Sequence, residues 1–161
     1  MTDDEKKDFN NALHYAYFFL KFRPRSVYEV TSYLQKKSKK RKWSQNAIPL
    51  VIQRLEDEKL IDDAAFTQWF VSQRISGKPK GEYVLRQELL RFRVPERFLN
   101  EYFLTHPPDE TALARRILVK RWLRLKDLPH EERTRKAYGF LSRRGFQFDV
   151  IKKTIAEMEE K

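Results

Sequence analysis

The sequence RPRSVYEV at residues 23–30 returns as KPKGEYVL at residues 78–85, at a constant offset of 55 positions. Both stretches place a proline between two basic residues, then a tyrosine, then aliphatic residues spaced for one face of a helix. The match continues to Leu34 and Leu89, and a further shift of 52 positions brings Leu89 onto Leu141. A repeat of this size predicts a series of small units that gain stability by stacking on their neighbours.

Each unit contains three segments in which apolar residues recur every three or four positions, the period of an α-helix. In the first unit, Ser26 and Glu29 form a capping box that begins a second helix. A third helix begins near Asn46, because Pro49 is tolerated only in a first turn. The lysine-rich run at residues 36–42 is interpreted as the loop between these two helices.

The same pattern follows twice more along the chain. Asp62 and Asp63 are suited to the cap and first turn of a new helix, and Gly145 is suited to a helix end. We therefore predict an all-α fold of three tandem three-helix repeats, at residues 9–61, 62–105 and 109–158. The repeats are expected to form an elongated, curved array.

Composition excludes several classes of protein. The 161 residues include 22 aromatic side chains, too many for a disordered polyelectrolyte, and no cysteine, which excludes disulfides and thiolate metal sites. The most apolar run, residues 12–20, is shorter than the roughly 20 residues that span a bilayer. It follows an acidic rather than a basic segment, so it does not resemble a signal peptide. We expect a cytoplasmic protein without a membrane partner.

The net charge of +11 is unevenly distributed. Residues 21–43 carry nine basic side chains and one acidic one, residues 74–97 carry seven and three, and residues 115–126 carry six and none. Such blocks favour binding to a polyanion through phosphate neutralisation and counterion release. Solvated helix faces are the alternative explanation.

Motifs for catalysis are absent from the sequence. It contains no glycine-rich phosphate loop, no G-x-S-x-G elbow and no histidine pair at a metal-binding spacing. We therefore expect neither an enzyme nor a bound cofactor or metal.

The basic side chains are the candidate contact residues. Arg116, Lys120 and Arg124 lie four residues apart along one predicted helix face, with Arg121 beside them. The prolines of the two matching stretches are flanked by Arg23, Arg25, Lys78 and Lys80. For residues 36–42, two interpretations remain: a loop that binds phosphates and a solvated insertion.

An ordered set of short motifs resembles the RecX family, bacterial regulators of the RecA recombinase. The motifs are Arg23-Pro24-Arg25-Ser26, Arg54-Leu55-Glu56, the segment 60–66 (LIDDAAF), Leu85 to Leu89, Arg143-Arg144-Gly145-Phe146 and Asp149-Val150-Ile151. The resemblance spans residues 12–155. Two departures are the more basic stretch at residues 38–42 and the acidic Glu82 in the second turn.

This resemblance implies three three-helix repeats that lie in the groove of the RecA–single-stranded DNA filament. It implies hindrance of filament extension, ATP hydrolysis, strand exchange and the co-protease activity of the SOS response. The implied partners are the RecA filament and single-stranded DNA, with duplex DNA as a further candidate, and a monomer is expected. A helix-turn-helix DNA-binding regulator is the alternative, and an RNA- or ribosome-associated protein rests on charge alone.

Overall fold

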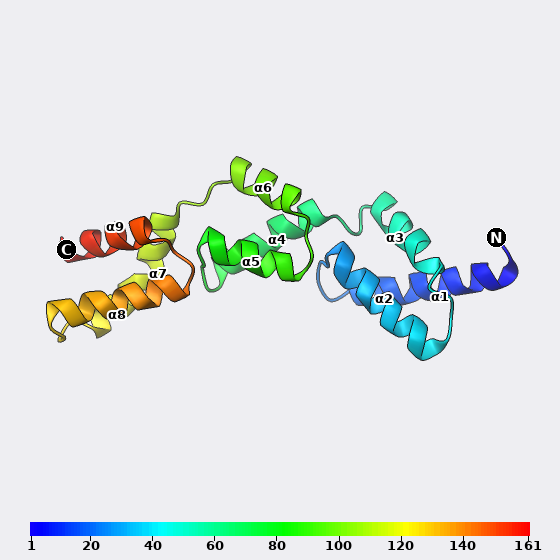
Figure 1. Cartoon of the computed structure of the whole chain (residues 1–161), viewed down its shortest axis with the longest axis horizontal. Coiled ribbons are helices and arrows are strands. Elements are labelled where there is room, and N and C mark those ends of the chain that lie inside the picture. Colours follow the sequence, from blue (N-terminus) through cyan, green and yellow to red (C-terminus); the bar gives the residue numbers. More distant parts are fainter. The chain divides into compact units, whose positions relative to one another are not determined.

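The computed structural model describes all 161 residues and contains nine α-helices and no β-strand. The all-α prediction is confirmed, and the helices follow one another in chain order (Figure 1). Their bounds are α1 (Asp3–Leu20), α2 (Val27–Arg41), α3 (Ala47–Asp57), α4 (Asp63–Ser76), α5 (Glu82–Arg91), α6 (Glu96–Thr105), α7 (Glu110–Arg124), α8 (His130–Arg143) and α9 (Phe148–Glu159).

Local sequence signals fix several helix ends. The Ser26 hydroxyl accepts a hydrogen bond from the Glu29 amide at 3.1 Å, and the Glu29 carboxylate accepts one from the Ser26 amide at 3.4 Å. This is the predicted capping box of α2. Helix α8 ends before Gly145, which has a φ of +85°, and the Phe146 amide bonds back to the Leu141 carbonyl at 3.3 Å. A glycine adopts this left-handed conformation without strain, and the conformation turns the following amides toward the last carbonyls of the helix.

The predicted loop at residues 36–42 is wrong, because α2 continues through Arg41 and only Lys42 leaves the helix, with a φ of 61°. One local and one tertiary contact hold this last part of the helix. Ser38 is buried and its hydroxyl donates to the Trp43 carbonyl at 2.8 Å, while the Lys37 ammonium lies 5.4 Å from the Tyr15 ring centroid. Cations in a last helical turn also interact favourably with the helix dipole.

The chain divides into two compact units, residues 1–69 with 89–99 and residues 70–88 with 100–161. In the first unit, α1, α2 and α3 pack around a core that includes Ala12, Ala16, Val30, Leu34, Val51 and Leu55. In the second, α7, α8 and α9 pack around Ala114, Leu118, Ala137, Leu141, Ile151 and Ile155. The curvature of the array and the repeat boundaries stay predictions.

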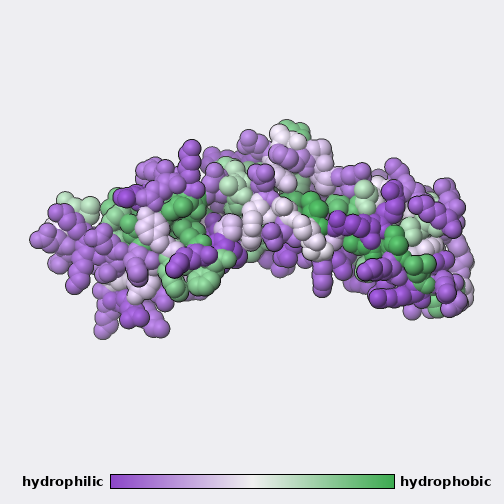
Figure 2. Space-filling model, turned by 180° about the vertical axis from the view of Figure 1, so that it is seen from behind, coloured by the Kyte–Doolittle hydropathy of each residue, from purple (hydrophilic) through white to green (hydrophobic).

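Hydrophilic residues cover much of the face drawn in Figure 2, with hydrophobic groups between them. No helix is both long enough and apolar enough to cross a membrane.

Helix α8 is longer at its start than the matching helix α5. The offset of 52 positions places Thr134 at the position of Glu82, the first residue of α5, whereas α8 begins at His130. The extra turn carries Arg133, whose guanidinium donates to the Trp122 carbonyl at 2.8 Å and lies 3.7 Å from the Trp122 ring centroid. The third repeat therefore has an added turn that folds onto its own first helix.

Candidate interaction surfaces

The start of α2 bonds to two later segments of the first unit. The buried Ser26 hydroxyl donates to the Phe92 carbonyl at 2.9 Å, and the Val27 amide donates to the Asp63 carboxylate at 3.0 Å. Asp63 is the first residue of α4. We call this set of contacts the first joint. It links the second helix of one repeat to the beginning of the next repeat.

The sequence placed both Asp62 and Asp63 at the start of their own helix. Asp62 does accept hydrogen bonds from the Ala64 and Ala65 amides, at 2.8 and 3.2 Å. Asp63 lies in the first turn of α4 as predicted, and its carboxylate also caps α2. Burial raises the pKa of this carboxyl group, an effect that the bond from Val27 opposes. Asp63 is therefore a structural link between repeats.

A second joint repeats this arrangement in the second unit. The Gly81 amide donates to the Arg144 carbonyl at 2.8 Å, and the Glu82 amide donates to the Glu110 carboxylate at 2.6 Å. Gly81 and Glu82 match Ser26 and Val27 at the offset of 55, and Glu110 is the first residue of α7 as Asp63 is of α4. In both joints, an acid at the start of the following repeat caps the preceding second helix.

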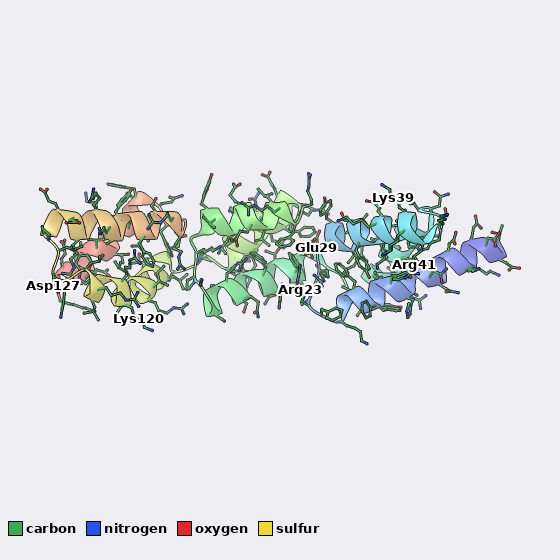
Figure 3. The ribbon with its side chains drawn as sticks, turned by 90° about the horizontal axis from the view of Figure 1, so that it is seen from below. Arg23, Glu29, Lys39, Arg41, Lys120 and Asp127 are labelled. Atoms are coloured by element: carbon green, nitrogen blue, oxygen red, sulfur yellow. The ribbon has the colours of Figure 1, made fainter.

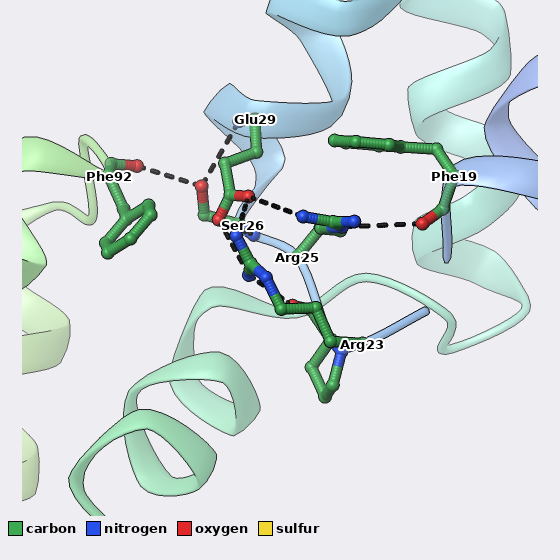
Figure 4. Close-up of polar contacts among 7 residues, drawn as sticks. Phe19, Arg23, Arg25, Ser26, Glu29 and Phe92 are labelled. Carbon is green, nitrogen blue, oxygen red and sulfur yellow. Dashed lines mark hydrogen bonds and ion pairs between the residues drawn. The ribbon is translucent and has the colours of Figure 1, made fainter. Parts of the chain in front are cut away.

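Both cations of the first basic turn are paired with a single carboxylate of their own chain. The Glu29 carboxylate lies 2.6 Å from the Arg23 guanidinium and 3.5 Å from that of Arg25 (Figure 4). The Arg25 guanidinium also lies 3.9 Å from the Phe19 ring centroid. Burial and the charge of Arg23 lower the pKa of Arg25, while Glu29 opposes this shift. Both arginines hold the turn in place, and their contact with a partner stays a prediction.

The second basic turn is only partly neutralised. The Glu88 carboxylate binds the Arg74 guanidinium at 2.9 Å and the Lys80 ammonium. Lys78 is exposed and takes part in no ion pair. Of the four basic residues that flank the prolines, Lys78 is therefore the one whose charge stays free for a partner.

The predicted ridge on α7 also divides into two kinds of residue. The Arg116 guanidinium donates to the Ile75 carbonyl of α4, and the Arg121 guanidinium lies 5.2 Å from the Phe140 ring centroid. Lys120 and Arg124 are exposed and have no ion-pair partner. Lys120 lies on the outer side of α7 in Figure 3. The structure thus leaves Lys120 and Arg124 as the free cations of the ridge.

A set of cations that the sequence analysis did not single out lies near the end of the second helix in each repeat. Lys40, Arg91 and Arg143 each lie two residues before a left-handed residue, which is Lys42, Arg93 or Gly145. All three are exposed and unpaired. Extending the 52-position alignment beyond Leu141 would have matched Arg91 with Arg143. In the first repeat, the offset of 55 places Lys36 rather than Lys40 opposite Arg91, because α2 continues beyond the length of α5.

These features define an all-helical protein of tandem three-helix repeats with a free cation near the end of each second helix. Two family models match the chain, described as "RecX, second three-helix domain" at residues 62–101 and "RecX, third three-helix domain" at residues 108–155. The regulatory protein RecX of Chlorobium phaeobacteroides (strain BS1) is 33% identical over 155 residues, covering 96% of this chain and 95% of that protein. The chain belongs to the RecX family of regulatory proteins, as the motif resemblance predicted.

Two other comparisons extend this finding. The regulatory protein RecX of Bacillus subtilis (strain 168) is 34% identical over 158 residues, which cover 98% of this chain but 57% of that longer protein. The crystal structure of RecX from Lactobacillus salivarius has the same fold, with a TM-score of 0.82 at 21% identity over the whole of both chains. The tandem-repeat fold is therefore confirmed by comparison with a solved structure.

Proposed function

We propose that the protein binds the filament that a RecA-type recombinase forms on single-stranded DNA and lowers its ATP hydrolysis, strand exchange and co-protease activity. The observation that carries this proposal is membership of a family of regulatory proteins over 96% of the chain. Recombinational repair and the SOS response are the processes that such binding would affect.

The distribution of free charge supports the proposal. Lys40, Arg91 and Arg143 lie near the ends of the second helices of successive repeats, and Lys78 adds a fourth unpaired cation. Each cation that neutralises a phosphate releases a counterion and contributes a modest, salt-dependent increment of affinity. Linked repeats combine such weak contacts through effective concentration. A repeating protein therefore suits a repeating polyanionic assembly.

The test is the ATP hydrolysis of the recombinase from the same organism on single-stranded DNA, measured while this protein is titrated in. We expect the rate to fall as the protein is added. An unchanged rate would remove the proposal.

Binding should then be compared among naked duplex, naked single strand and recombinase-coated strand, each over a salt series. We expect the tightest binding to the coated strand. Tight, sequence-dependent binding to naked duplex would instead support the helix-turn-helix alternative.

The triple variant Lys40→Glu, Arg91→Glu and Arg143→Glu should weaken binding and flatten its salt dependence by roughly one unit or less of slope per cation. Its matched control is Lys6→Glu, Lys7→Glu and Lys153→Glu, which makes the same change in net charge at other exposed positions. Equal losses in both variants would mean that net charge alone governs binding.

A further inference from the structure

The outer face of α7 combines exposed aliphatic side chains with free cations. Val119 is 41% exposed and Leu123 is 61% exposed, and they lie one helical turn apart. Lys120 and Arg124 follow them directly in sequence and are exposed as well. No acidic residue occurs between Arg115 and Lys126. An aliphatic row and a cationic row therefore run side by side along this helix.

The aliphatic row borders a groove of about 480 Å³ within the second unit. Its apolar walls come from Val119, Trp122 and Leu123 of α7 and from Met158 of α9. Trp122 is 5% exposed and its ring is covered by the guanidinium of Arg133, so it is not placed to stack on a nucleobase. The rest of the lining is polar, with Arg133, Lys161 and the Glu159 carboxylate, which lies 2.6 Å from His130. The groove offers aliphatic contacts rather than aromatic stacking.

This combination distinguishes the α7 face from the end of α2. There the exposed side chains in the last turn are all cationic, namely Lys39, Lys40 and Arg41. Figure 3 labels Lys39 and Arg41 near this helix end. Binding to a phosphate backbone depends mainly on charge and hydrogen bonds, and exposed aliphatic groups between the cations add little to it. A bound amphipathic helix would use both the aliphatic groups and the cations. Its apolar face packs in the groove, and its polar flank pairs with charges at the rim.

We propose that the α7 face, formed by Val119, Lys120, Leu123 and Arg124, binds an acidic amphipathic helix of a protein partner. Leucine-like residues of that helix pack on the aliphatic row and the groove, and its carboxylates pair with the two cations. For the identity of the partner the inference rests on the proposed function, in which the protein component of the filament supplies the helix. Under this proposal, Lys120 and Arg124 bind protein, and the cations at the ends of the second helices bind DNA.

The first test uses no recombinase. The probe is a synthetic 16-residue helical peptide with leucines along one face and glutamates beside them, titrated into the full chain while methyl NMR signals are recorded. We expect the Val119 and Leu123 methyl signals to shift. A peptide with lysine in place of every glutamate, and a scrambled acidic peptide, should shift them much less. Unchanged methyl signals, or equal shifts with the scrambled peptide, would overturn the inference.

Two variants separate the aliphatic from the cationic contribution. Val119→Ser with Leu123→Ser, and Lys120→Glu with Arg124→Glu, should each weaken peptide binding by about tenfold, since small clusters of residues dominate such interfaces. Leu104→Ser, at a position 83% exposed, and Lys153→Glu are the matched controls and should leave binding unchanged. Thermal unfolding checks that every variant folds, since these exposed positions contribute little to stability.

The second test compares recombinase-coated with naked single strand. Val119→Ser with Leu123→Ser should weaken binding to the coated strand by about tenfold and leave binding to the naked strand within about twofold. Equal losses on both would overturn the inference. If the wild-type protein binds the acidic peptide through α7 but does not bind the coated strand, the proposed function fails and the inference stands.

Discussion

The two joints make the same link between repeats with different chemical groups. In the first, the side-chain hydroxyl of Ser26 reaches the Phe92 carbonyl, whereas in the second the backbone amide of Gly81 reaches the Arg144 carbonyl directly. A Cβ atom on Gly81 would lie 2.1 Å from the Gly145 carbonyl oxygen, so the second joint brings two backbones into contact. Both joints keep a carboxylate that caps the second helix. The residue before that helix, Ser26 or Gly81, determines how closely the chain approaches the carbonyl of Phe92 or Arg144.

The largest expected effect comes from Gly81→Ala. The added methyl group would overlap backbone atoms, which cannot move aside as a flexible side chain can, so we expect a loss of roughly 3 kcal/mol in the free energy of unfolding, measured by urea denaturation.

Gly139→Ala is the control for this substitution. Its Cβ would lie 3.2 Å from the flexible end of Arg143, and it sits within α8, so it should stabilise the protein by up to about 1 kcal/mol. Equal stability of the Gly81→Ala variant and the wild type would show that the second joint opens without cost.

Ser26→Ala tests the joint that a side chain makes. It removes both the cap of α2 and the bond to Phe92, so we expect a loss of about 1–2 kcal/mol, smaller than for Gly81→Ala because no backbone atoms overlap. Ser32→Ala, in the same helix, should change stability by less than about 0.5 kcal/mol. Similar effects of the two serine variants would mean that the first joint adds no stability.

The smallest effect concerns the buried acid of the first joint. Asp63→Asn keeps an oxygen for the Val27 amide and removes the buried charge, so at neutral pH it should be as stable as the wild type or more stable by about 1 kcal/mol.

The pH dependence of Asp63→Asn has a defined sign. Because the folded-state pKa of Asp63 is raised, the folded wild type binds more protons than the unfolded chain between the two pKa values. Its free energy of unfolding relative to Asp63→Asn should be highest below the ordinary aspartate pKa and fall as the pH rises through the raised value. A difference that is constant from pH 3 to 7 would contradict this expectation.

The sequence predicted the helices, the Ser26 capping box and the Gly145 helix end, because these depend on residues a few positions apart. It did not predict that Asp63 caps α2, since the Val27 amide lies 36 residues away in the chain. The sequence predicted a loop at residues 36–42 because propensity does not reveal the contact of Lys37 with Tyr15 or the burial of Ser38. The same limit applies to Arg23 and Arg25, whose shared partner Glu29 was recognised only as a capping residue.

The added turn of α8 has a consequence for how the repeats depend on one another. In the second repeat, the Ile75 carbonyl near the end of α4 accepts a guanidinium from the following repeat, whereas the Trp122 carbonyl near the end of α7 accepts one from the repeat's own Arg133. In the third repeat, the guanidinium that binds the end of the first helix therefore comes from the same repeat, whereas in the second repeat it comes from the next one. Loss of the Arg133 guanidinium would therefore act within the third repeat alone, whereas loss of the Arg116 guanidinium would act on the end of α4 in the preceding repeat.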